Sequence, residues 1–65
     1  MDLNQEQQQI FNSILDLFDC LKIEKDQEKK THIKHLVERE KNKLMNSMPF
    51  RDYLALMREA APLFM

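Results

Sequence analysis

The stretch IFNSILDLFDCL, residues 10–21, decides the fold of this chain. Its apolar side chains recur at spacings of three and four, the period at which an α-helix returns to the same face. At about 100° per residue they fill an arc roughly 160° wide, broad enough to contact two neighbouring elements. We expect a central helix over residues 3–23, capped by Asp2 or Asn4. Its apolar arc consists of Ile10, Phe11, Ile14, Leu15, Leu17, Phe18 and Leu21.

Glycine is absent from all 65 residues, which also favours helices. Hairpin turns between strands, helix C-caps and phosphate-binding loops depend on the positive φ angles that glycine adopts easily. A chain without glycine must be built mainly from helices and simple connections. It also lacks the glycine-rich loop that phosphate-binding sites use.

The charged stretch EKDQEKKTH, residues 24–32, contains no apolar side chain, so a break in the helix is expected there. Asp26 is a good N-cap for a second helix over residues 27–46. Because neither glycine nor proline interrupts the stretch, one long helix running through it is the alternative. The second helix is weakly apolar, and Glu40 stands where another apolar residue would be expected. Its narrow stripe consists of Ile33, Leu36, Val37, Leu44 and Met48.

Pro49 separates the second helix from a third. Proline lacks a backbone N–H and disfavours helical geometry at the preceding residue. We therefore expect a helix over residues 49–61 that begins at the proline, with Ser47 or Met48 as its cap. Pro62 ends it and leaves an apolar tail over residues 62–65. One face of the third helix carries Phe50, Tyr53, Leu54, Met57 and Ala61.

Charge and size bear on how these helices assemble. Residues 1–24 have a net charge of −4 and residues 25–43 a net charge of +3, so antiparallel packing of the first two helices places opposite charges together. A chain of this size buries only about 60% of its unfolded surface, so its core is thin. The predicted fold is all-α: a helical hairpin plus a third helix, as a three-helix bundle in one domain over residues 1–65. We expect a homodimer to cover the apolar surface that remains.

The sequence offers little for catalysis or metal binding. His32 and His35 are spaced as two metal ligands could be, but structural zinc needs four and no second pair exists. Cys20 is expected to be a small, half-buried side chain at the margin of the first helix's apolar face. So short a helical chain has little room for a water-excluding cleft. We expect no enzymatic activity, cofactor or metal.

A single cysteine excludes an intrachain disulfide and suits a reducing compartment. The N-terminal residues do not resemble a signal peptide, and the apolar runs are too short to span a bilayer. The polar side of the third helix is balanced in charge, whereas helices that lie on membranes are rich in Lys and Arg. We therefore predict a cytoplasmic protein that does not bind membranes.

Protein binding is the function class that we favour. Aromatic and methionine side chains are enriched in interface cores and adaptable binding surfaces. The expected protein is a regulator, inhibitor or adaptor that occludes or bridges a partner protein. The alternative for the same side chains is that they close the chain's own core or a dimer interface. The candidate partner-binding residues are Phe50, Tyr53, Leu54, Met57, Leu63 and Phe64.

A small dimeric DNA-binding transcriptional regulator is the alternative function. Its basic second helix would lie in the major groove, as in helix-turn-helix proteins. Lys30, Lys34 and Lys41 lie on one flank of the apolar stripe and would contact phosphates. Acidic residues such as Glu38 are interleaved with these lysines and would repel the phosphates. This interleaving favours the protein-binding interpretation.

Overall fold

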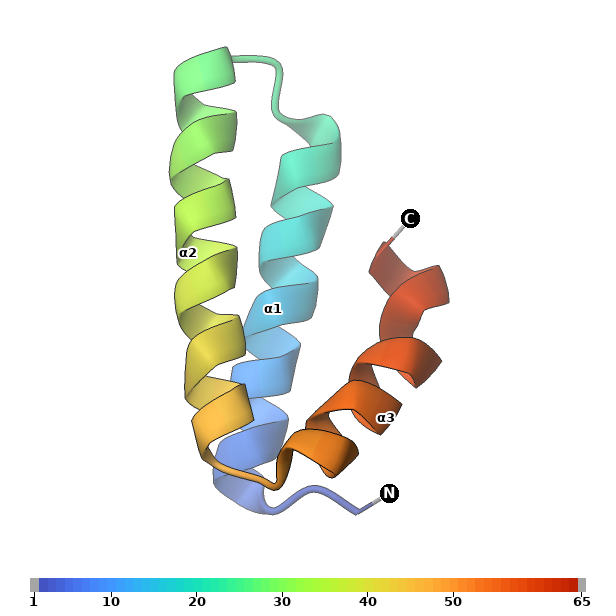
Figure 1. Ribbon diagram of the computed structural model, residues 1–65. Helices are drawn as coiled ribbons and strands as arrows, with labels where there is room; N and C mark the ends of the chain where they lie inside the picture. The colour runs from blue at the N-terminus through green and yellow to red at the C-terminus, as the bar shows by residue number, and fades with distance from the viewer. Residues whose placement is uncertain (1, 65) are drawn as a thin grey trace.

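The computed structural model describes residues 2–64, with only the backbone of Phe64, and in that range it holds three α-helices, a short 3-10 helix and no strand (Figure 1). The all-α class predicted from the sequence is confirmed. Two long helices lie side by side and antiparallel, and the third begins where the second ends and lies beside the hairpin, with the 3-10 helix that follows it in contact with the first. The helices are α1 (Gln5–Ile23), α2 (Gln27–Asn46), α3 (Phe50–Ala60) and η1 (Ala61–Phe64).

The connections between helices need no glycine. No described residue has a positive φ angle. α1 ends because the backbone of Glu24 is extended, at φ −77° and ψ 132°, while its N–H still donates to the carbonyl of Cys20. The chain thus breaks within the charged stretch, and one continuous helix is excluded. The break itself occupies only residues 24–26.

Side chains cap the first two helices at predicted positions. The Asn4 side chain accepts from the N–H of Gln7 at 2.8 Å, and the Gln7 side chain accepts from the N–H of Asn4 at 3.1 Å. This reciprocal pair satisfies two donors that a helix leaves without partners. Asp26 caps α2 by accepting from the N–H of Glu28 at 2.9 Å. Both cap positions therefore follow from local sequence.

The cap predicted for the third helix is wrong. The Ser47 hydroxyl donates to the carbonyl of Leu44 at 2.8 Å, so Ser47 closes α2 and does not open α3. The N-cap of α3 is Pro49, which provides no side-chain hydrogen bond. Its carbonyl accepts from the N–H of Tyr53 at 3.0 Å, and the helix begins at Phe50, one residue later than predicted. Of the predicted tail, residues 62–64 belong to η1, and Met65 lies outside the described residues.

We expect Asp26→Ala to lower the free energy of unfolding by about 1 kcal/mol, because the N–H of Glu28 loses its acceptor. Asp26→Ser keeps a capping oxygen and should retain most of the stability. Urea unfolding followed by circular dichroism measures both variants. Equal stability of the alanine and serine variants would contradict the capping role.

The core lies where α3 meets the α1–α2 hairpin. Ile14, Leu44 and Leu56 form its buried centre, one from each helix. Ile14 and Leu44 are entirely shielded from solvent. Around them pack the partly buried side chains of Leu3, Ile10, Phe11, Phe18, Met48, Tyr53 and Met57.

α3 turns a different sector toward the core than the sequence predicted. Leu56 and Ala60 are buried, whereas Phe50 is 59% and Leu54 43% exposed. At about 100° per residue, Leu56 and Phe50 lie roughly 120° apart around the helix. The apolar arc of α3 is therefore wider than the hairpin surface it contacts. The side that carries Phe50 and Leu54 remains in solvent.

α3 is too short to cover the hairpin. At about 1.5 Å per residue, its 11 residues extend about 16 Å, whereas the 19 residues of α1 extend about 28 Å. Two side-chain hydrogen bonds join α1 to the segments that precede and follow α3. The Gln7 amide donates to the carbonyl of Ser47 at 2.9 Å, and the Lys22 ammonium donates to the carbonyl of Leu63 at 3.2 Å. η1 thus continues α3 along α1 as far as the last turn of that helix.

Candidate functional site

The predicted partner-binding residues lie at different depths. Phe50 and Leu54 are exposed and, one helical turn apart, form what we call the α3 apolar surface. Tyr53 and Met57 are half-buried and contact the core. Leu63 is exposed, but it lines a separate hollow beside Phe11 and Leu56. The side chain of Phe64 lies outside the described part of the chain. The structure thus brings only part of the predicted set together.

An aromatic pair joins the α3 apolar surface to the core. The rings of Phe50 and Tyr53 stack with centroids 6.3 Å apart and planes inclined by 21°. Burial raises the pKa of the Tyr53 hydroxyl, and the Glu38 carboxylate of α2 adds to the rise. Tyr53 therefore lies between the exposed Phe50 ring and the second helix.

Tyr53 is the only tyrosine, so its absorbance reports its titration directly. We expect a folded-state midpoint above the ordinary value of about 10 that the urea-unfolded chain shows. Because the folded-state pKa is the higher one, the stability that neutral Tyr53 contributes is complete below about pH 10 and is lost as pH rises through the folded-state pKa. Glu38→Gln should move the midpoint part of the way back. Identical midpoints in folded and unfolded protein would contradict this arrangement.

A shallow groove lies between α1 and α2. Its floor consists of Phe18, Leu21 and Val37, and its rim of Lys34, Glu38 and Lys41. The Lys41 ammonium lies 5.5 Å from the centroid of the Phe18 ring and 3.7 Å from a Glu38 carboxylate oxygen. The groove holds about 200 Å³, less than the roughly 300–1,000 Å³ of small-molecule sites.

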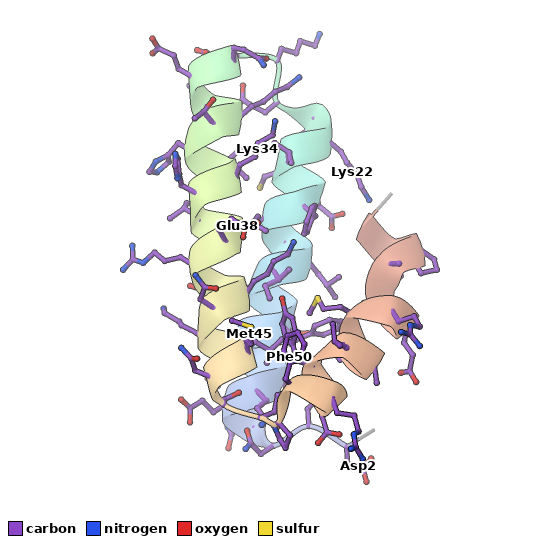
Figure 2. The ribbon with its side chains drawn as sticks, in the orientation of Figure 1. Asp2, Lys22, Lys34, Glu38, Met45 and Phe50 are labelled. Atoms are coloured by element: carbon purple, nitrogen blue, oxygen red, sulfur yellow. The ribbon has the colours of Figure 1, made fainter. Side chains whose placement is uncertain are left out.

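The lysines proposed as nucleic-acid contacts are only partly gathered. Lys34 and Lys41 lie on the groove rim with Glu38 between them in the sequence, whereas Lys30 is half-buried and does not line the groove. Sequence reasoning missed this groove, although the wide apolar arc of the first helix beside a short third helix signals it. In Figure 2 one face carries, from top to bottom, Lys34, Glu38, Met45 and Phe50.

Other candidate residues lie in solvent. His32 and His35 are exposed on α2, and within residues 2–64 no three His, Cys, Asp or Glu side chains converge as a metal site would require. Cys20 is exposed, which corrects the half-buried position expected for it. It lies roughly 120° around α1 from Ile14, outside the contact with α2 and α3. No helix in the described range has the length and apolar character needed to cross a membrane.

The chain matches no protein-family model, no curated protein and no solved structure. What it does must therefore follow from its own surfaces. The α3 apolar surface consists of exposed apolar side chains, whereas the apolar residues that line the α1–α2 groove are half-buried or buried.

Proposed function

We propose that this protein is a small, non-enzymatic, cytosolic module that regulates, inhibits or links a partner protein by binding it through the α3 apolar surface. The supporting observation is that Phe50 and Leu54 are exposed, because α3 packs into the core with another side of the helix. Contiguous exposed apolar side chains commonly mark interaction sites. Apolar residues four apart are the anchors with which a helix enters a partner's groove.

The stacked pair makes Phe50 a suitable anchor. Tyr53 packs against the core cluster, and the Phe50 ring rests against Tyr53. An aromatic side chain already restrained in the free protein loses less conformational freedom on binding. The exposed thiol of Cys20 is compatible with the reducing conditions of the cytosol.

We also propose that two copies associate. The chain exposes 4905 Å², whereas about 4,400 Å² is typical of a folded monomer of its mass. The excess of roughly 500 Å² is a large part of the about 800 Å² that one partner contributes to a standard interface. Sedimentation equilibrium tests this, and a monomer at all concentrations would contradict it. If the dimer dissociates only when Phe50 and Leu54 are replaced by alanine, the α3 apolar surface is the dimer interface. That result would contradict its use for binding another protein.

Site-specific photocrosslinking tests the partner proposal. A photoreactive phenylalanine analogue replaces Leu54 in one variant and Ile23, which is 79% exposed at the far end of α1, in the other. We expect a host protein to crosslink from position 54 and not from position 23. Crosslinking of the same proteins from both positions, or only of a second copy of this chain from position 54, would refute the proposal.

A further inference from the structure

We infer that the partner protein receives the α3 apolar surface in an apolar groove with carboxylates along one wall, and that Arg51 and Arg58 of α3 pair with these carboxylates. The inference rests on the proposed function and names the chemistry of the partner. Three observations carry it. Two apolar side chains of α3 are exposed, two arginines lie along one flank of them, and neither arginine forms an ion pair with any of residues 2–64.

The charged side chains of α3 are separated by sign around the helix axis. At about 100° per residue, Arg51 and Arg58 lie roughly 20° apart, and both are within about 60° of Leu54. Asp52 and Glu59 are also about 20° apart, but they lie roughly 140–160° from Leu54. Glu59 accordingly lines the separate hollow between α1 and α3. Although α3 carries as many acids as bases, its flank beside Leu54 is therefore basic.

Both arginines are exposed, and the helix offers them no acid. Within a helix, an arginine pairs with an acid three or four residues away. Between Arg51 and Arg58 these positions are occupied by Leu54 and Ala55. No ion pair among the described residues includes either arginine. A carboxylate of a partner can therefore bind each arginine without displacing an internal pair.

The spacing of the arginines sets the spacing of the acids that they bind. Arg51 and Arg58 are seven residues apart, which at about 1.5 Å per residue is about 10 Å along the axis of α3. Arginine holds a carboxylate through two parallel hydrogen bonds, and it is enriched among the energetically important residues of protein interfaces. Phe50 and Leu54 supply the apolar contact beside this flank. The complementary surface is therefore an apolar groove with two carboxylates about 10 Å apart on one wall.

Three other occupants fit this surface less well. Two arginines are few for a nucleic acid, since proteins that bind one commonly contact about six to ten phosphates. Anionic lipids would attract the arginines but repel Asp52 and Glu59 on the far side of α3. A second copy that packs its α3 antiparallel around a two-fold axis would gather four arginines along one edge, where like charges repel. An acidic groove of another protein meets none of these obstacles.

Charge-reversal variants, titrated against the host protein that crosslinks from position 54, test the inference. We expect Arg51→Glu and Arg58→Glu each to weaken binding about tenfold or more, because the new carboxylate would face a carboxylate of the partner. Arg39→Glu makes the same change on exposed surface of α2, about 140° around that helix from buried Leu44, and should alter binding less than about twofold. Isothermal titration calorimetry with the purified partner measures the affinities. Circular dichroism melting of the three variants should match that of the parent chain, since all three arginines are exposed.

Mapping of the crosslinked segment of the partner gives a second readout. Aspartate or glutamate should line one wall of the groove there, and replacing it with arginine should restore binding of the Arg51→Glu or Arg58→Glu variant. A loss no greater than that of Arg39→Glu, or a crosslinked groove without acidic residues, would overturn the inference. If the parent chain crosslinks a host protein whose affinity the charge reversals leave unchanged, only this inference falls. If position 54 crosslinks only lipid, nucleic acid or a second copy, the proposed function falls with it.

Discussion

Ile14→Ala is expected to lower the free energy of unfolding by about 2–5 kcal/mol, the usual cost of truncating a fully buried aliphatic side chain. Ile14 is completely shielded and belongs to the buried centre with Leu44 and Leu56. At about 0.05–0.15 kcal/mol per residue, a chain of 65 residues has about 3–10 kcal/mol of stability to lose. The variant should therefore lose much of its helical circular dichroism in mild urea.

Ile23→Ala is the matched control, since it removes the same atoms from a side chain that is 79% exposed. Its stability should stay within about 0.5 kcal/mol of the parent chain. Equal losses in the two variants would contradict the placement of Ile14 at the centre of the core. A loss below about 1 kcal/mol for Ile14→Ala would contradict it as well.

The second large effect is on binding. Replacing Phe50 and Leu54 together by alanine should weaken binding to the partner crosslinked at position 54 about a hundredfold or more. Truncating an interface anchor commonly costs about 2 kcal/mol or more, and two such losses exceed a factor of 100. Isothermal titration calorimetry with the purified partner measures the change.

The stability of this double variant decides between two interpretations of α3. Because Phe50 and Leu54 are largely exposed, we expect its free energy of unfolding to fall by no more than about 1 kcal/mol. A loss as large as that of Ile14→Ala would mean that both side chains close the core. Ile23→Ala should bind the partner as the parent chain does.

Local sequence accounts for much of the hairpin. The recurrence of apolar residues around Ile14 predicts α1 and its buried centre, because a period of 3.6 allows one continuous face. The absence of apolar residues after Ile23 predicts the break, and the short polar side chain of Asp26 predicts the cap. Each of these features depends on neighbours within a few positions of the chain.

The orientation of α3 could not be predicted in this way. Periodicity groups Phe50, Tyr53 and Leu54 on one face and leaves out Leu56, which α3 buries. Which side is buried depends on the angle at which the chain leaves Pro49, and so on contacts between distant residues. The sequence likewise puts Cys20 at the margin of the apolar face of α1. Whether that margin is buried depends on how far the neighbouring helices reach around α1, and Cys20 is exposed.

Solvent accessibility of Leu54 tests most directly whether the α3 apolar surface is open in the free chain and covered by a partner. Nuclear magnetic resonance measures how strongly a soluble paramagnetic gadolinium chelate broadens each methyl signal. In dilute free protein, Leu54 should be broadened less than Ile23 but far more than buried Leu44; after addition of the partner, Leu54 should be protected and Ile23 not. Protection of Leu54 in the free chain, or its continued broadening in the complex, would contradict the account.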